Sequence, residues 1–385
     1  MENSVKVMIW GKTALGKYLA NHIFKGQEKI KPLAYIDNNP LLQNRNMENI
    51  PVISFEQFYQ RQDTAEIIVL LTVKNATGFF QIIRQLEKIK TLKIGIVKQR
   101  VLIKGSQVNI DETEEIVWCK EKGRFYKTIP RLEINLIDAC NLKCKGCSHF
   151  SSIFMQDSVY PLEEYKKDLR QLNEVGTLGR IRLLGGEPFL LQNLDAYLSA
   201  TRAVFKNTDI EVVTNGLLIP KANKEVMSAL KEYNIIIAIS PYEPTLKLKE
   251  QIASTLKSCD VSWYFVGEEI SYFTRNLTLQ NNHDAKKSSQ ACLSSGCLFL
   301  RRGRLYKCPV EALVNDFYKY YGLMYRYEGG TDIYQNVDNL YQQIVAYALE
   351  PSKMCQYCAE TPENIKWSVA SNPSLQDWLY KGENK

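Results

Sequence analysis

Long hydrophobic runs are missing from this chain of 385 residues. The longest, at residues 67–73 and 235–239, are far shorter than the roughly 20 apolar residues that a membrane-spanning helix needs. They are typical of buried strands, so we expect no membrane span. The first residues also lack a basic segment followed by an apolar stretch and a cleavage site, and we therefore expect no secretory signal and a cytoplasmic protein.

Blocks of like charge are absent as well. The formal charge is +7, but the 49 Lys and Arg residues are scattered, and no nucleic-acid-binding motif accompanies them. We expect a small-molecule partner and no nucleic acid. A phosphate-bearing ligand fits the basic excess, and so does a simple role in solubility. With 24% charged and 45% hydrophobic residues, the composition is that of a globular protein, and the length predicts two or three domains.

Cysteine, in contrast, is plentiful, with ten residues. Because we expect no export, they indicate metal or thiol chemistry in a reducing compartment rather than a disulfide framework. Eight of the ten fall in two groups. The first group is Cys140, Cys144 and Cys147, and the second is Cys292, Cys297, Cys308, Cys355 and Cys358.

The first hundred residues predict a parallel sheet with helices between its strands. Asp37 ends the second expected strand, where a dinucleotide-binding unit keeps an acidic residue, but Thr13 stands where such a unit has its second glycine. A side chain there would hinder the approach of a pyrophosphate, so we predict a Rossmann-like fold without assigning it NAD or another nucleotide. Strands are expected at residues 5–10, 33–36, 67–72 and 92–97, with a helix at 78–88.

A second series of strand-then-helix units follows. Its polar and glycine-bearing residues fall at the carboxyl ends of the strands, which predicts a partial (β/α) barrel with its site on that face. Strands are expected at 132–137, 180–184, 210–214, 235–240 and 261–266, and a hairpin at 298–306. The predicted organisation is a Rossmann-like domain at 1–104, a linker at 105–128, the barrel at 129–290 and a small α+β domain at 291–385.

The spacing of the first cysteine group suits one iron–sulfur cube. Three thiolates can bind three of its irons and leave the fourth iron without a protein ligand. A zinc site would use the same thiols but needs a fourth ligand nearby. The turn Gly185-Gly186-Glu187-Pro188 adds two glycines that let backbone approach a ligand, beside a carboxylate that can hold an ammonium group.

Together, the cysteine loop and this turn resemble the radical S-adenosylmethionine (SAM) superfamily. The resemblance implies a [4Fe–4S] cluster on Cys140, Cys144 and Cys147, with SAM on the open iron as the source of a 5′-deoxyadenosyl radical. It implies that Glu187 and its flanking backbone bind the SAM amino group. Thr214, Asn215 and Ser240 match strand ends that contact the cofactor, although they are equally typical of turns and caps. Many members carry an aromatic residue where this chain has Gly146, so His149 or Phe150 packs there instead, or nothing does.

The second cysteine group, with Gly303 before Cys308, resembles the shortened auxiliary-cluster ("twitch") domain behind some radical SAM cores. This implies a second [4Fe–4S] cluster on Cys292, Cys308, Cys355 and Cys358, with zinc as the alternative. Cys297 remains as a fifth thiol. It either replaces Cys292 as a ligand, or donates a hydrogen atom to a substrate radical, or is a small buried hydrophobe. Cys259 has the same two non-ligand alternatives.

The N-terminal segment resembles Rossmann-like domains attached to enzymes of surface-glycan and nucleotide-sugar metabolism. We therefore predict a radical SAM oxidoreductase or epimerase that acts on a carbohydrate or nucleotide-sugar substrate, with a flavodoxin or ferredoxin as electron donor. Five tyrosines within residues 317–327 fit either a sugar ring or simple packing. The alternatives are a peptide-modifying maturase and a zinc-stabilised binding or scaffold protein.

Overall fold

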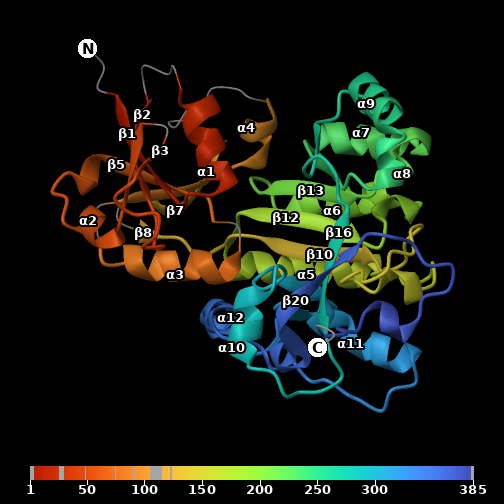
Figure 1. Ribbon diagram of the computed structural model, residues 1–385. Helices are drawn as coiled ribbons and strands as arrows, with labels where there is room; N and C mark the ends of the chain where they lie inside the picture. The colour runs from red at the N-terminus through yellow and green to blue at the C-terminus, as the bar shows by residue number, and fades with distance from the viewer. Residues whose placement is uncertain are drawn as a thin grey trace. The chain divides into compact units, whose positions relative to one another are not determined.

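The computed structural model describes residues 4–25, 30–47, 49–73, 75–89, 92–104, 115–121 and 124–382. The chain forms two compact units, each built on a mainly parallel sheet with helices, which confirms the predicted α/β class (Figure 1). The first unit comprises Met1–Pro130, Gly176–Arg180 and Asn207–Asp209, and the second unit comprises the remainder. No helix in the described ranges is long and apolar enough to cross a membrane.

The sheet of the first unit has the strand order β3-β4-β2-β1-β5-β6-β7-β8. Neighbouring strands from β4 to β6 are parallel, and the outer strands β3, β7 and β8 pair antiparallel. The strands are β1 (Val5–Trp10), β2 (Ile30–Ile36), β3 (Asn46–Met47), β4 (Ile50–Ile53), β5 (Ile67–Leu71), β6 (Lys93–Val97), β7 (Ile116–Glu121) and β8 (Arg124–Phe125). The helices are α1 (Ala14–Tyr18), α2 (Phe55–Tyr59), α3 (Ala76–Leu86) and α4 (Gln99–Lys104), and a short sheet pairs β9 (Thr128–Ile129) with β11 (Thr177–Leu178).

The glycine turn after β1 uses its polar side chains internally. The Thr13 hydroxyl accepts a hydrogen bond from the Gly16 amide at 3.1 Å and donates one to the Thr72 hydroxyl at 3.0 Å. The Asp37 carboxylate accepts from the Lys12 amide at 2.8 Å. Thr13 therefore caps α1, while Asp37 ties the end of β2 to the turn, and both side chains have a structural role that needs no ligand.

Part of the expected linker at 105–128 is a strand. Ile116–Glu121 forms β7, which pairs antiparallel with β6 and buries Cys119. Burial raises the pKa of the Cys119 thiol to about 12, as befits a cysteine that only packs. The acidic residues before β7 dominated the sequence pattern and hid this short strand. Residues 105–114 lie outside the described residues.

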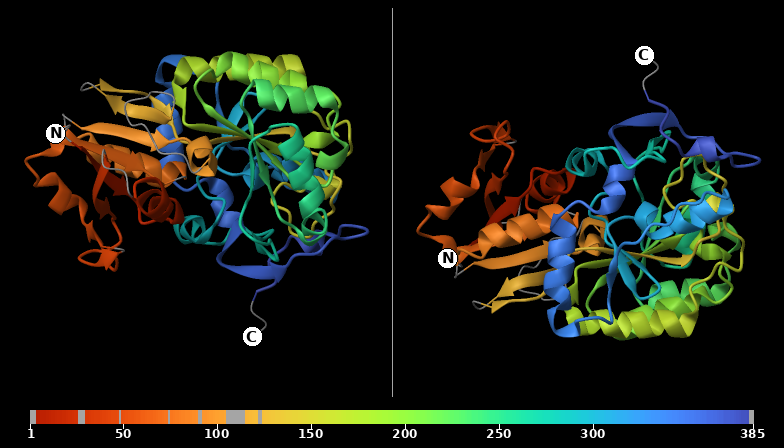
Figure 2. Two further views of the ribbon diagram at one scale, coloured as in Figure 1. Left: turned by 90° about the horizontal axis from the view of Figure 1, so that it is seen from above. Right: turned by 90° about the horizontal axis from the view of Figure 1, so that it is seen from below.

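The sheet of the second unit has the order β15-β14-β13-β12-β10-β17-β18-β19. The pairs β15–β14, β14–β13, β12–β10 and β10–β17 are parallel. Its strands are β10 (Leu132–Ile137), β12 (Arg180–Gly185), β13 (Asp209–Thr214), β14 (Ile236–Ile239), β15 (Trp263–Phe265), β17 (Phe299–Arg301), β18 (Arg304–Tyr306) and β19 (Thr331–Asp332). The connecting helices α5 (Leu162–Val175), α6 (Leu194–Val204), α7 (Lys224–Glu232), α8 (Glu243–Leu246) and α9 (Lys249–Ser258), yellow-green to green in Figure 2, lie along the outside of the curved sheet.

Strand β10 is the centre of this sheet, and all six of its residues are buried. Leu132, Ile134, Leu136 and Ile137 supply the apolar pattern by which its bounds were predicted to the residue. The predicted hairpin is also present as β17 and β18. It does not stand apart, because β17 pairs with β10 and continues the same sheet.

The remaining C-terminal elements are β16 (Tyr272–Leu277), α10 (Ala285–Ala291), α11 (Pro309–Tyr320), α12 (Leu340–Leu349) and β20 (Cys358–Lys366), and β16 pairs antiparallel with β20. Among them, α11 contacts both strands of the hairpin and α12 contacts β19. Residues of the tyrosine-rich stretch belong to an apolar cluster here: Phe317 and Tyr318 are buried, and Phe317 stacks on Phe150 with ring centroids 4.4 Å apart. Phe317 and Tyr318 therefore pack in the core, whereas Tyr320 and Tyr325 are exposed.

Candidate cluster and cofactor site

A cavity of about 370 Å³ opens where β10, β12, β13 and β14 end. All three cysteines of the first group line it, and so do the other strand-end residues that the sequence singled out except Glu187 and Pro188. The cavity surface includes Cys140, Cys144, Cys147, Gly185, Gly186, Thr214, Asn215 and Ser240, together with Glu133, His149, Arg182, Tyr242, Phe273 and Ser294. The parallel strands thus bring residues that are far apart in sequence to one face of the sheet.

The cysteine loop is anchored at its base by Asp138. Its carboxylate accepts a hydrogen bond from Asn135 Nδ2 at 2.9 Å and forms an ion pair with Arg301 Nη1 at 2.6 Å. Asn135 is on β10 and Arg301 is on β17, so two neighbouring strands hold the start of the loop. Asp138 is only 4% exposed, and a buried carboxylate needs such partners.

The three thiols of the loop are close enough to influence one another. Burial raises the pKa of Cys140, and Glu187, Cys147 and Cys144 raise it further. Burial, followed by repulsion from Cys147, raises the pKa of Cys144 to about 12. Cys140 and Cys144 are therefore protonated without metal, and a thiol loses its proton to a metal that binds it.

This donor set fits an iron–sulfur cluster. Soft thiolates suit such clusters, and three of them at the edge of an open cavity leave room for a ligand on a fourth iron. Within the described ranges, no three His, Cys, Asp or Glu side chains converge closely enough to hold a single metal ion. A cube binds each thiolate through a different iron, so its ligands spread more widely than those of one zinc ion.

The two glycines of the 185–188 turn let β12 lie against the cysteine loop. A Cβ at Gly186 would come within 1.9 Å of the Ala139 carbonyl oxygen, and one at Gly185 within 1.9 Å of the Ile137 carbonyl oxygen. The Gly186 amide donates to Ile137 at 2.8 Å. From the sequence we predicted that these glycines let the backbone approach a ligand. In the structure they also let β12 approach the backbone of residues 137–139, which leaves no room for a Cβ.

Glu187 lies in the protein interior beneath the cavity. It is 0% exposed, and its carboxylate accepts hydrogen bonds from the Thr214 hydroxyl at 2.6 Å, the Asn215 amide at 2.9 Å and the Phe189 amide at 3.1 Å. Burial raises its pKa to about 7, although these three donors oppose the shift. Pro188 begins the 3₁₀ turn that carries Phe189. The carboxylate therefore organises the ends of β12 and β13.

Asn215 joins the end of β13 to the cysteine loop. Its side-chain amide donates to Asn141 Oδ1 at 2.6 Å and approaches Cys140 Sγ at 3.7 Å. Its own Oδ1 accepts from the Leu217 amide at 3.0 Å. The amide of Ser240 donates to the Thr214 carbonyl at 2.9 Å. For Thr214, Asn215 and Ser240 the sequence predicted either cofactor contacts or a role in turns. In the structure they make turn hydrogen bonds and also line the cavity.

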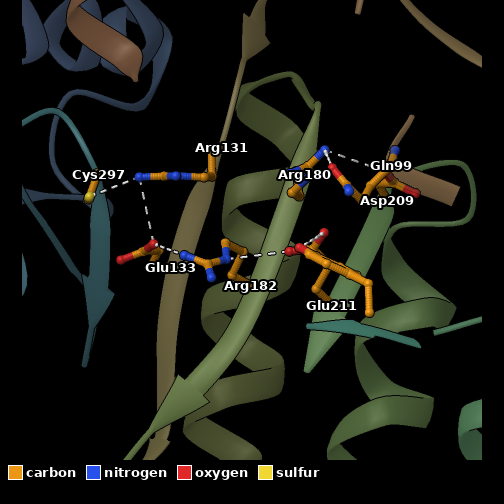
Figure 3. A network of polar contacts seen from close by, with 9 residues as sticks. Gln99, Arg131, Glu133, Arg180, Arg182, Asp209, Glu211 and Cys297 are labelled. Carbon is orange, nitrogen blue, oxygen red and sulfur yellow. Dashed lines mark hydrogen bonds and ion pairs between the residues drawn. The ribbon is translucent and has the colours of Figure 1, made fainter. Parts of the chain in front are cut away.

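A row of buried charges crosses the second unit below the cavity. Figure 3 shows Arg131, Glu133, Arg182 and Glu211 side by side on neighbouring strands. Arg182 pairs with Glu133 at 2.7 Å and with Glu211 at 3.4 Å. Burial disfavours the Glu133 carboxylate, but Arg182 and Arg131 outweigh burial and lower its pKa. The cavity therefore has a charged polar floor at Glu133 and Arg182.

His149 completes this floor. Its Nδ1 lies 3.1 Å from Asn135 Oδ1, and its ring meets Phe299 edge to face. Burial lowers its pKa, although Glu133 and Asp138 oppose the shift. His149 is therefore a neutral, hydrogen-bonded residue at neutral pH.

Cys297 lies at the Arg131 end of the charged row (Figure 3). Arg131 Nη2 donates to its Sγ at 2.9 Å, and burial, followed by Glu133, raises its pKa to about 12. Neither Cys297 nor Cys259, at the end of α9, is among the described residues that line the cavity. The structure therefore does not bring the two candidate hydrogen donors to the cavity surface.

The four other cysteines of the second group come together from four elements. Cys292 follows α10, Cys308 caps α11, Cys355 lies in the 3₁₀ turn Lys353–Tyr357, and Cys358 begins β20. Burial raises the pKa of Cys358 well above its usual value, and Cys292 and Cys355 raise it further. Burial, followed by Glu311, Cys292 and Cys358, also raises the pKa of the Cys308 thiol. Cys297 takes no part in these interactions, so the structure groups Cys292 with the other three.

Sequence reasoning missed the aromatic residues around the first cysteine loop. Tyr242 lines the cavity and stacks on Trp367 with ring centroids 5.2 Å apart. Trp367 Nε1 donates to Cys144 Sγ at 3.3 Å, and Trp378 Nε1 donates to the Cys147 carbonyl at 2.9 Å. Tyr242 follows a predicted strand end and could have been found there. No local pattern marks the two tryptophans.

Known proteins are similar to this chain over the segment that carries the three-cysteine loop and most of the cavity. Residues 134–255 match the model of the radical SAM superfamily. A GTP 3',8-cyclase of Alkaliphilus metalliredigens is 31% identical over 119 residues, which are 30% of this chain and 37% of that protein. One from Helicobacter pylori is 26% identical over 143 residues, 36% of this chain and 44% of that protein. The chain thus spans less than half the length of these relatives.

Solved structures resemble the chain more loosely. BtrN in complex with AdoMet and 2-DOIA is 14% identical, with a TM-score of 0.36 over 60% of this chain and 94% of that one. Streptococcus suis SuiB bound to S-adenosylmethionine is 21% identical, with a TM-score of 0.30 over 35% of this chain and 33% of that one. Scores of this size carry no argument about the fold or substrate. The family match covers the three-cysteine loop, the 185–188 turn and the strand ends around the cavity, so over residues 134–255 the chain is similar to the radical SAM superfamily.

Proposed function

We propose that this protein is a radical SAM enzyme that abstracts a hydrogen atom from a carbohydrate or nucleotide-linked sugar and oxidises the carbon that carried it. The observation that supports this most is the cavity, whose surface combines three thiols with strand-end residues and a charged polar floor. When bound at Cys140, Cys144 and Cys147, the cluster and SAM supply a 5′-deoxyadenosyl radical. The residues of the chain then bind, orient and shield the reactants.

The strand ends are assigned to the cofactor. The backbone at Gly185 and Gly186 faces the cavity and offers carbonyl oxygens to an ammonium group. Glu187 supports this surface from below, through its hydrogen bonds to Thr214 and Asn215. We therefore assign Glu187 a positioning role and give cofactor contacts to Thr214, Asn215 and Ser240.

The polar floor is assigned to the substrate. Glu133, Arg182, His149 and Ser294 present both donors and acceptors, as a hydroxyl-rich ligand requires, and the rings of Tyr242 and Phe273 suit the apolar face of a sugar. We do not carry the substrate of the GTP 3',8-cyclases over to this chain, because the aligned segments cover less than half of those proteins. A peptide substrate remains the competing proposal.

Oxidation is the favoured branch because of the second cysteine group. A carbinol that has lost one hydrogen atom must still lose one proton and one electron to become a carbonyl, and a cluster with four protein ligands is suited to accept the electron. We propose Cys292, Cys308, Cys355 and Cys358 as those ligands. Cys297 points to Arg131 rather than to the cavity, so hydrogen return by this thiol, and hence epimerisation, is disfavoured. A flavodoxin or ferredoxin would supply the electron for SAM cleavage.

The test is anaerobic reconstitution followed by metal analysis and SAM cleavage. We expect about eight irons per chain, the brown absorbance of iron–sulfur centres, and 5′-deoxyadenosine whose yield rises with a sugar or nucleotide-sugar substrate. Peptide pools, tested in parallel, separate the maturase alternative. A colourless protein that holds zinc and forms no 5′-deoxyadenosine under strong reductant would overturn the proposal in favour of a scaffold role.

A further inference from the structure

The far end of the chain returns to the three-cysteine loop. We call residues 365–370 the strap. The Lys145 amide donates to the Ser368 carbonyl at 2.9 Å, and the Ala370 amide donates to the Lys143 carbonyl at 2.8 Å. These bonds form an isolated antiparallel bridge between Cys144 and Val369. The strap thus adds a short strand to the loop that carries the three thiols.

The strap also explains Gly146. Its φ of +69° lies in the left-handed region, and a Cβ at this position would come within 2.6 Å of Ile365 Cδ1. Ile365 is the next-to-last residue of β20, so this strand fills the space beside the loop. The absence of a side chain at Gly146 therefore makes room for Ile365. The strap covers the loop at the position where many radical SAM proteins have an aromatic residue.

Trp367 is the strap residue that contacts a thiol of the loop. Its Nε1 donates to Cys144 Sγ at 3.3 Å, and its ring is held against Tyr242 at an interplanar angle of 18°. Cys144 is 7% exposed, so this bond lies largely out of water. A hydrogen bond to a ligating sulfur favours the cluster state with more negative charge, which is the reduced state.

We propose that the Trp367 N–H bonds the ligating thiolate of Cys144 and raises the reduction potential of the cluster at the three-cysteine loop. This inference rests on the proposed function, because it requires a cluster there. Trp367 acts through Cys144 and is a positioning residue. The cluster thereby accepts an electron from a donor of higher potential than it would with a bare loop.

The chain provides a matched control. Trp378 Nε1 also donates to the loop, but to the Cys147 carbonyl oxygen rather than to a sulfur. Trp367→Phe and Trp378→Phe each remove one indole N–H from the same loop and keep an aromatic ring. An effect that needs an N–H···S bond appears in the first variant alone, whereas a general loosening of the loop appears in both.

The experiment is a redox titration of the reconstituted full-length protein, followed by electron paramagnetic resonance of the reduced first cluster. At a fixed potential we expect Trp367→Phe to lower the ratio of reduced to oxidised cluster by up to about tenfold, which for one electron is about 59 mV. Trp378→Phe should leave the ratio unchanged. Equal potentials in wild type and Trp367→Phe, or equal shifts in both variants, would overturn the inference.

A second measurement needs no variant. Wild-type protein labelled with ¹⁵N at the tryptophan indole should show a ¹⁵N hyperfine coupling to the reduced cluster, together with a proton coupling that disappears in D₂O. Absence of both couplings in a protein that holds the cluster refutes the inference while leaving the proposed function intact. A wild-type protein that loads no cluster at this loop refutes the proposed function, and with it this inference.

Discussion

The two cysteine groups differ in how the chain builds them. Cys140, Cys144 and Cys147 lie on one loop after β10 and line a cavity. Cys292, Cys308, Cys355 and Cys358 come from four separate elements, and none of them is among the described residues that line this cavity. Three thiols beside open space suit a centre that binds a ligand, and four thiols away from it suit a centre that only passes electrons or holds structure. We expect this difference in surroundings to separate reactive from supporting chemistry.

Cys140→Ala should separate the two sites most strongly. It removes a ligand from the open site alone, so we expect iron to fall from about eight to about four per chain and 5′-deoxyadenosine to fall to background. Metal analysis and product chromatography on the same sample measure both. If the variant kept full iron, the loop would not be a cluster site.

Cys292→Ala and Cys297→Ala form a matched pair for the second cysteine group. We expect Cys292→Ala to lose about four irons while the open site keeps its cluster spectrum, since only Cys292 interacts with the other three thiols. Cys297→Ala should retain all the iron, because its thiol bonds Arg131 instead. The reverse pattern would exchange the roles of the two cysteines.

Arg301→Met tests how the hairpin next to the second cysteine group supports the open loop. It leaves the Asp138 carboxylate buried without its cation, and we expect a loss of about 3–5 kcal/mol in the free energy of unfolding. Asp316→Asn removes the other partner of Arg301, which is 45% exposed, and should cost less than about 1 kcal/mol. Urea unfolding of the metal-free protein measures both. Equal losses would show that the buried pair is not special.

Glu187→Gln gives the smallest expected effect. Burial raises the pKa of Glu187 from 4.5 to about 7, so the folded state disfavours the charged form. Its contribution to stability is therefore greatest below pH 4.5, falls between pH 4.5 and 7, and is constant above, with a total change of about 3 kcal/mol at most. The variant should lose this part of the pH dependence, whereas the exposed Glu164→Gln should keep it. The measurement is the free energy of unfolding at pH 5 and pH 8. If it changes equally with pH in wild type and Glu187→Gln, the raised pKa of Glu187 is contradicted.

Much of the fold could be predicted because its strands are short apolar runs bounded by glycine and polar residues. β10 and β1 matched their predicted bounds, since both are central strands with buried side chains. Strand β7 was missed because its sequence, Ile-Val-Trp-Cys-Lys-Glu, has only a short apolar run and follows an acidic cluster. The continuation of β10 by β17 was also missed, since pairing between distant strands leaves no local mark.

The candidate site was predictable as a set of residues but not as a geometry. The motif placed Glu187 near the cofactor, yet burial of its carboxylate beneath Thr214 depends on how β12 and β13 pack. The choice between Cys292 and Cys297 needed the position of Arg131, which lies 166 residues before Cys297. Trp367 lies 223 residues after Cys144, and no spacing rule reaches that far.

That separation has a consequence for how the protein is made. A ribosome adds about 5–20 residues per second, so the 223 residues from Cys144 to Trp367 take on the order of 11–45 s to synthesise. During that interval the three-cysteine loop has no strap and its thiols are open to whatever delivers or removes metal. Ile365 and Trp367 can cover the loop only after that interval, because both are synthesised more than 200 residues after it. If the loop holds the proposed cluster, the strap separates insertion into an open loop, before that time, from insertion into a covered one.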